Sequence, residues 1–216
     1  MFVYYPSCNF TIASKEASKK IKDYLKEKHG MRIEGCCRPG HKSLTSQDTA
    51  VTICQSCSAI IRENVSDINE VSIWEVLDND KDFPWPDLHG EKITLQDCWR
   101  ARDKKSLHDA VRSIMKKMNI DIVEMEDNYE KSEFCGVFRY NPMVEKNIKI
   151  APNYFVDQME GYLEFHNAEE QQRLMEEHCK LYTTERVVCY CNSCLRGVKQ
   201  GGMNGVHLME LIMQTV

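Results

Sequence analysis

The feature that most constrains the fold is an internal repeat. Each half of the chain begins with a short apolar stretch that runs into a cysteine, Cys8 in the first half and Cys98 in the second. Each stretch is predicted to form a short buried strand with a thiol at its carboxyl end. From each cysteine to the residue expected to stop the next helix there are 22 residues in one half and 21 in the other. This matched spacing predicts two copies of one structural unit.

The two helical segments carry similar start and stop signals. In the first half Ser14 is the expected N-cap, apolar residues recur every four positions over 17–25, and Gly30 is expected to end the helix. In the second half residues 107–118 present one apolar face, and Asn119 is the expected stop. Both segments are therefore predicted to be amphipathic helices.

The remaining elements of the repeat also occur twice. Second strands are predicted at 31–33 and 120–125, and third strands at 50–53 and 186–188. Each second strand is followed by a cysteine site, Cys36-Cys37 in the first half and Cys135 in the second. Each third strand runs into a CxxC motif, at Cys54–Cys57 and at Cys191–Cys194. A last helix follows each motif, at 72–77 and at 207–212. The predicted unit is strand, helix, strand, strand, helix, used twice.

This order of elements predicts an α/β fold with right-handed crossovers and mostly parallel sheets. We expect two duplicated cysteine-rich α/β units, over residues 1–83 and 84–216, which pack as a pseudo-twofold pair. The boundary falls in the linker-like stretch 78–91, which is rich in Asp and Pro. The second unit carries an insertion near 138–185, with a predicted helix at 168–181, that would act as a lid or a contact surface.

Composition limits the environment and the partners. The chain has eleven cysteines among 216 residues, an odd count, and no export signal, which argues against a disulfide framework. Its net charge is -5 and its Lys and Arg residues are dispersed, so we expect no nucleic-acid partner. No apolar run is long enough to cross a bilayer, so we expect no transmembrane segment and a cytoplasmic protein.

Most of the cysteines are expected to converge, because the carboxyl ends of parallel strands meet at the ligand-binding edge of an open sheet. The first half supplies five thiols at the ends of three strands: Cys8, Cys36, Cys37, Cys54 and Cys57. A CxxC at a helix start stabilises thiolates, and thiolate sets of this size select iron–sulfur clusters or zinc. The competing interpretation is a group of buried, inert thiols.

This cysteine pattern resembles the tandem CCG (cysteine-rich) domain of heterodisulfide reductase and its relatives, over nearly the whole chain. The likeness is closer in the second half, where the match includes Cys135-Gly136. The resemblance implies two domains that each hold a cluster and that pass electrons or cleave a disulfide at the cluster. In that family five cysteines of a domain bind an unusual non-cubane four-iron cluster. Carried over, the first ligand set is the five thiols above, and the second is Cys98, Cys135, Cys191 and Cys194.

Neither half has an intact CCG motif. The first half has Arg38 where the family has Gly after the paired cysteines, and the second has Phe134 in place of the first cysteine of the pair. A four-cysteine second site fits a cubane 4Fe-4S cluster, a tetrahedral zinc ion or an empty remnant. Cys189 would face the same side of a strand as Cys191 and is a candidate for the missing thiolate.

A few other side chains are candidates for a role at the sites. His41 is a candidate proton donor to a leaving thiolate. Arg38, Arg100 and Arg102 would offset cluster charge or bind an anionic substrate, or lie solvated at the surface. His207 and Cys179 are expected to be a capping or packing residue and an ordinary helix residue, respectively.

These features lead to one main hypothesis and two alternatives. The main one is an iron–sulfur redox protein that takes electrons from a flavoprotein or ferredoxin-like partner subunit and reduces a disulfide or another thiol-bearing acceptor, with the first site as the reactive one. The first alternative is a structural module in which zinc, which is redox-inert, fills the sites. The second is an electron relay without substrate turnover.

Overall fold

The computed structural model describes residues 1–140 and 145–216. The described chain divides into two compact units. Unit 1 contains residues 1–76 and 145–160, and unit 2 contains residues 77–140 and 161–215. Both are α/β units, as the repeat predicts.

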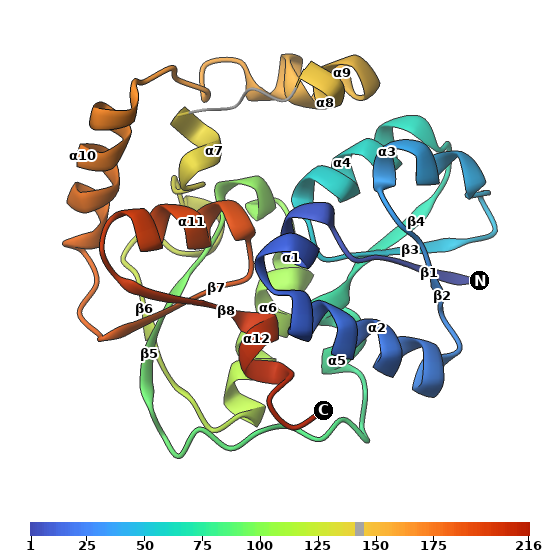
Figure 1. The fold of residues 1–216 in the computed structure, drawn as a ribbon, viewed down its shortest axis with the longest axis horizontal. Coiled ribbons are helices and arrows are strands. Elements are labelled where there is room, and N and C mark those ends of the chain that lie inside the picture. The colour runs from blue at the N-terminus through green and yellow to red at the C-terminus, as the bar shows by residue number, and fades with distance from the viewer. Residues whose placement is uncertain (141–144) are drawn as a thin grey trace. The chain divides into compact units, whose positions relative to one another are not determined.

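Unit 1 is built around four short strands. Its elements are β1 (Phe2–Tyr5), α1 (Cys8–Ala13), α2 (Lys15–His29), β2 (Arg32–Ile33), α3 (Cys37–Gly40), η1 (His41–Ser43), β3 (Thr49–Thr52), α4 (Gln55–Asn64), β4 (Asn69–Ser72) and the start of α5 (Ile73–Asp78), followed later in the chain by α8 (Glu145–Ile150), α9 (Pro152–Phe155) and η4 (Asp157–Met159). The strands form one parallel sheet in the order β2-β1-β3-β4. Helices α3 and α4 lie on one face of this sheet and α2 on the other (Figure 1).

Helix α2 has the limits that its sequence predicts. Ser14 is the N-cap, and Gly30 ends the helix in the left-handed conformation at φ 60°, where a side chain would be strained. The apolar stripe is buried, with Ile21 and Leu25 fully covered. Burial of this stripe fixes the helix on the sheet and leaves its charged face in solvent.

Unit 2 repeats the arrangement. Its elements are β5 (Lys92–Gln96), η2 (Trp99–Ala101), α6 (Lys105–Lys117), β6 (Asp121–Glu124), η3 (Tyr129–Lys131), α7 (Val137–Tyr140), α10 (Ala168–Cys179), β7 (Arg186–Cys189), α11 (Asn192–Gln200), β8 (Asn204–His207) and α12 (Leu208–Ile212). The four strands are again all parallel, in the order β6-β5-β7-β8. This order matches that of unit 1 strand for strand, so the predicted duplication is confirmed.

The fourth strand of each sheet is not predicted by the sequence. The pattern indicates a helix starting near Ser72 and His207, and helices α5 and α12 do start one residue later. However, β4 and β8 come directly before them and pair with the third strand of their sheets. Each is only four residues long, with polar or glycine residues at half its positions or more, so neither has the alternating apolar pattern that marks a strand.

The segment between Cys135 and Cys191, expected as an insertion near 138–185, divides between the two units, and its residues 141–144 lie outside the described part. Helices α8 and α9 pack against α4 in unit 1. Asn64 of α4 donates to the Ile150 carbonyl (2.9 Å), and the Glu63 carboxylate accepts from the backbone N–H groups that begin α9. Helices α7 and α10 belong to unit 2. No helix in the described residues is both long and apolar enough to cross a membrane.

Candidate metal centre

Unit 2 brings four buried cysteine thiols together at the carboxyl ends of its strands. The Sγ atoms of Cys98, Cys135, Cys191 and Cys194 all lie within 4.8 Å of one another. Those of Cys98 and Cys135 are 3.7 Å apart. Among the residues that the structure describes, no other group of three or more such ligand atoms is this compact. These four cysteines could hold a metal ion or a metal cluster.

Three chain segments deliver these thiols. Cys98 lies just past β5, Cys135 lies in the loop after β6, and the CxxC motif follows β7. Cys191 is the N-cap of α11, and Cys194 is in the first turn of that helix. The positive end of the helix dipole favours thiolate over thiol at these two positions.

The four thiols lie so close together that their pKa values differ. Hydrogen bonds from the other three thiols, of which Cys135 is the largest cause, hold the pKa of Cys191 well below its usual range, and the positive charge of Arg100 adds to this. Burial raises the pKa of Cys194 well above its usual range, and its thiol neighbours raise it further. A metal ion would displace the protons that this set of thiols retains.

Arg100 is the cation of the site. Its side chain is buried, with Nε 3.2 Å from Cys135 Sγ and Nη2 3.6 Å from Cys191 Sγ. The guanidinium lies 4.1 Å from the centroid of the Phe138 ring, which restricts its position. Arg100 thus offsets thiolate charge, one of the roles that the sequence indicates for it, whereas the Arg102 guanidinium lies over the Trp99 ring.

Two glycines allow the Cys135 loop to reach the start of α11. Gly136 has φ 50°, and a Cβ there would lie 2.0 Å from the carbonyl oxygen of Ser193. A Cβ on Gly197 would lie 2.7 Å from the Gly136 Cα. The Ser193 hydroxyl also links the loop to α11, because it donates to the Cys135 carbonyl (2.9 Å). No other residue type fits at Gly136 without moving the backbone.

A buried polar network holds the backbone of Cys98 in place. The Cys98 N–H donates to the Tyr190 hydroxyl (2.9 Å), which donates to the Asp97 carboxylate (3.2 Å). Asp97 is 1% exposed and forms a 2.6 Å ion pair with Arg112, which also binds Glu124 at 2.7 Å. Every buried charge in this chain of contacts therefore has an opposite charge beside it, as buried ions require.

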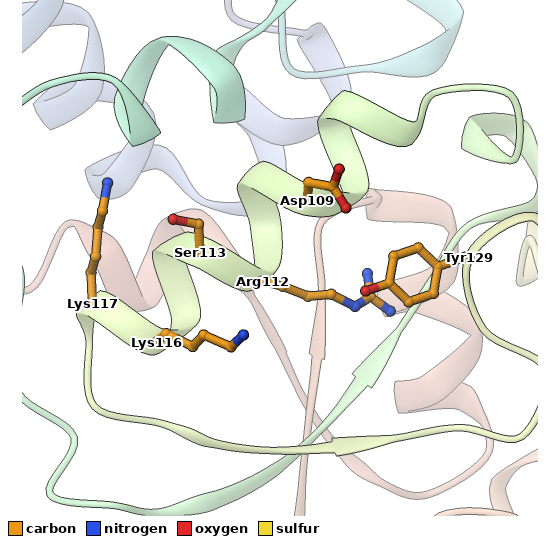
Figure 2. Close-up of a pocket in the computed structure, with 6 residues that line it drawn as sticks. All are labelled: Asp109, Arg112, Ser113, Lys116, Lys117 and Tyr129. Carbon is orange, nitrogen blue, oxygen red and sulfur yellow. The ribbon is translucent and has the colours of Figure 1, made fainter.

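Arg112 reaches the surface side of this network from helix α6. Its guanidinium lies 3.5 Å from the centroid of the Tyr129 ring, and Figure 2 shows the two side chains facing each other beside α6. Both residues line an open groove of about 530 Å³. The sequence does not predict this network, because its members are far apart in the chain and nothing marks Arg112 among the other basic residues of α6.

A stacked pair of aromatic rings lies beside the thiols. The Trp99 and Tyr162 rings are stacked with centroids 3.5 Å apart, and each residue is nearly fully buried. Burial raises the Tyr162 pKa far above its usual range, and the negative charge of Cys135, Cys98 and Cys194 raises it further. Tyr162 therefore stays a neutral phenol beside the sulfurs and helps to exclude water.

Three residues considered from the sequence have other roles. Cys189 lies in β7, is fully buried and is outside the group of mutually close sulfurs. Cys179 donates to the Val198 carbonyl (3.5 Å) and packs against α11. His207 caps α12, with Nδ1 accepting from the Met209 N–H at 3.2 Å, and so has the capping role expected of it.

The five cysteines of unit 1 form a looser set. Hydrogen bonds link the thiols of Cys8 and Cys36, of Cys37 and Cys57, and of Cys54 and Cys57. Cys8 is exposed and Cys36 and Cys54 are partly exposed, whereas Cys37 and Cys57 are buried. The hydrogen bond from Cys57 lowers the pKa of Cys37, and the same bond raises the pKa of Cys57 well above its usual range.

The two polar candidates of unit 1 lie next to this set. His41 is buried, with Nδ1 3.1 Å from the Cys37 carbonyl oxygen. Arg38 donates from Nε to Asn147 Oδ1 (2.8 Å) and from Nη1 to Cys36 Sγ (3.9 Å).

Comparison with known protein families gives no matching family model. Comparison with curated protein sequences gives no match either.

Proposed function

We propose that this chain is an iron–sulfur redox protein similar to the CCG-domain proteins of heterodisulfide reductase. The observation that carries the proposal is the pair of cysteine sets at equivalent ends of two identical parallel sheets. One set is buried and closed, and the other is partly exposed. In this proposal the unit 2 set holds a 4Fe-4S cluster that stores or relays electrons, and the unit 1 set holds the reactive cluster, with a non-cubane form favoured by its five thiols.

The ligand types of the unit 2 set suit such a cluster, whereas the spacing of their sulfurs suits a single ion. Four thiolates are the usual ligands of iron–sulfur clusters, and clusters of this kind supply one-electron chemistry when bound. The residues of the chain hold and tune them: Arg100 donates to two sulfurs, and all four cysteines are buried. Hydrogen bonds to sulfur and low solvent access are the features by which a protein adjusts cluster potential.

Reduction of a disulfide needs two electrons and two protons, and releases two thiols. We propose that the electrons come from a flavoprotein or ferredoxin-like partner and that the protein works in the cytoplasm. His41, buried beside Cys37, is the nearest candidate in unit 1 for delivering a proton to a leaving thiolate. An electron relay without substrate turnover would need the cluster but not His41.

A single zinc ion is the second candidate for the unit 2 set, and the sulfur spacing favours it. Four sulfurs at a Zn–S distance of about 2.3 Å lie about 3.8 Å apart. The separation of 3.7 Å between Cys98 and Cys135 is close to this value. A four-iron cluster is larger and requires wider spacing. Zinc would make unit 2 a structural centre and leave only unit 1 for redox chemistry.

Anaerobic purification with counts of iron, sulfide and zinc per chain tests the proposal. Iron and sulfide in comparable amounts, with visible absorption that bleaches on reduction, are the expected result. Zinc alone, with no visible absorption after reconstitution with iron and sulfide, would overturn the redox function.

A further inference from the structure

The position after the central cysteine differs between the two units. In unit 2 it is Gly136, which fits tightly against α11, and in unit 1 it is Arg38. Arg38 is not left free at the surface: its Nε donates to Asn147 Oδ1 at 2.8 Å, and Asn147 is 5% exposed. A buried amide therefore fixes the orientation of a partly exposed guanidinium.

Asn147 comes from a distant part of the chain that is itself anchored. It lies in α8, which packs with α9 against α4, the helix that begins at the CxxC motif of unit 1. Asn64 and Glu63 tie the α8–α9 segment to α4 through three hydrogen bonds of 2.9 to 3.0 Å. The guanidinium is therefore held in place relative to the thiols by two elements, α3 and α8.

The fixed guanidinium lies at the open side of the thiol set. Its Nη1 is 3.9 Å from Cys36 Sγ, and Cys36 is hydrogen bonded to the exposed Cys8. Its positive charge acts to lower the pKa of both Cys8 and Cys37. The carboxylate of this loop, Glu34, pairs with Arg32 at 3.5 Å and does not neutralise Arg38 in the described structure.

We propose that Arg38, oriented by Asn147, is a specificity residue that selects sulfur compounds carrying an anionic group, such as a carboxylate, close to the reacting sulfur. A guanidinium recognises a carboxylate through directed hydrogen bonds as well as charge. The inference rests on the proposed function, because it names the class of substrate that the unit 1 thiols receive.

The charge preference of these thiols can be measured without a substrate of known identity. The reduced full-length chain is alkylated at low ionic strength with iodoacetate, an anion, or with iodoacetamide, its neutral analogue, and modification of Cys8 is followed by peptide mass spectrometry. Arg38→Gln should lower the iodoacetate-to-iodoacetamide rate ratio about threefold, the effect of an ion pair at a partly exposed site. Arg62→Gln, which removes an exposed cation from α4, should leave the ratio unchanged.

Asn147→Asp gives a second measure of the same charge. It keeps the shape of the side chain but places a carboxylate on the Arg38 guanidinium, so the iodoacetate rate should fall by a larger factor than the iodoacetamide rate. A ratio that is the same in the original chain and in both variants, with circular dichroism showing that the variants fold, would overturn the inference.

Where iron occupies the unit 1 thiols and protects Cys8 from alkylation, an anionic and a neutral thiol are compared instead, mercaptoacetate and 2-mercaptoethanol. Their binding is followed by the change in visible absorption. The affinity for mercaptoacetate should drop selectively in Arg38→Gln. Failure of the proposed function is distinct: a chain that never takes up iron would still show the alkylation ratio and its dependence on Arg38, but would reduce no disulfide.

Discussion

The two cysteine sets occupy equivalent positions in identical sheets, yet only the set in unit 2 is compact. In unit 2, Gly136 follows the central cysteine and Gly197 lies three residues after the CxxC motif, and a side chain at either would collide with the other's segment. In unit 1 these positions are Arg38 and Ile60. Glycine at both positions lets one loop lie directly on the first turn of the helix in unit 2, whereas the matching elements of unit 1, α3 and α4, pack against each other with larger side chains at these positions.

This difference has a chemical consequence. Where the loop and helix touch, four sulfurs lie within 4.8 Å in a site that excludes water, and an arginine faces two of them. In unit 1 the thiols are hydrogen bonded to one another but form no such compact group, and Cys8 is open to solvent. Unit 2 thus has a closed site, suited to holding a metal, and unit 1 has an open one, suited to reacting with an outside molecule.

The largest expected effect comes from removing a ligand. Cys135→Ser should abolish metal binding by unit 2 and lower the free energy of unfolding by several kcal/mol, because the free energy of metal binding contributes to folding. Metal content per chain and denaturant unfolding measure both effects. Cys37→Ser is the matched change in unit 1: it should abolish disulfide-linked activity and leave the unit 2 metal in place. Loss of the unit 2 metal in Cys37→Ser would show that the two sites are not independent, and its retention in Cys135→Ser would show that Cys135 is not a ligand.

Gly136→Ala should have the next largest effect. The added Cβ would lie 2.0 Å from a backbone oxygen, in a residue whose φ of 50° already disfavours a side chain. We expect a loss of about 2–4 kcal/mol in unfolding free energy and a marked loss of metal affinity, since the strain falls on the ligand loop. Gly30→Ala is the control, because Gly30 also has positive φ but nothing lies within 4 Å of its added Cβ. Equal losses in the two variants would show that close approach is not what Gly136 provides.

Arg100 should have a smaller effect, confined to unit 2. Arg100→Gln removes the charge beside Cys135 and Cys191, so metal affinity should fall about 10- to 100-fold, the usual effect of losing a group that supports metal ligands. Competition with a chelator measures the affinity. Arg102→Gln is the control, because the Arg102 guanidinium lies over the Trp99 ring instead. Equal affinities in the two variants would rule out a role for Arg100 at the sulfurs.

The α/β class, the duplication and the close approach of the second cysteine set are all predictable from the sequence, because strand ends, helix stops and cysteine spacing are local signals that occur in both halves of the repeat. Gly136 and the CxxC motif also mark the position of the unit 2 site. The fold class of a repeated unit is thus well determined by local pattern.

The rest depends on contacts between distant residues. Nothing in the sequence pairs Arg112 with Asp97, or Asn147 with Arg38, which are 109 positions apart. The division of the inserted segment between the two units likewise depends on how α8 and α9 pack against α4. The polar strands β4 and β8 are held in their sheets by backbone hydrogen bonds to β3 and β7. The pattern of their side chains does not predict this pairing.

The smallest expected effect is a pH dependence that arises in unit 2. His178 on α10 is stacked on Phe134 with ring centroids 3.8 Å apart, and its Nε2 lies 2.8 Å from Gln96 Oε1. Burial lowers its pKa to about 4. The ordinary value is about 6.5, so on acidification the unfolded chain takes up a proton before the folded chain does, and stability falls as the pH drops from about 6.5 towards 4. Below that range both states are protonated and the loss stops.

Titration of His178 should lower the free energy of unfolding by about 1–2 kcal/mol between about pH 7 and pH 5. The measurement is denaturant unfolding at both pH values for the original chain and for His178→Phe, which keeps an aromatic ring against Phe134 but cannot titrate. The variant loses the hydrogen bond to Gln96 at every pH, so only the difference in slope between the two proteins reports the titration. His166→Phe is the control, because it removes another imidazole of unit 2, one that is paired with the exposed Glu164. If the original chain and His178→Phe lose the same stability between the two pH values, the acid sensitivity of unit 2 comes from another group, and His207, whose pKa burial also lowers to about 4, is the first one to test.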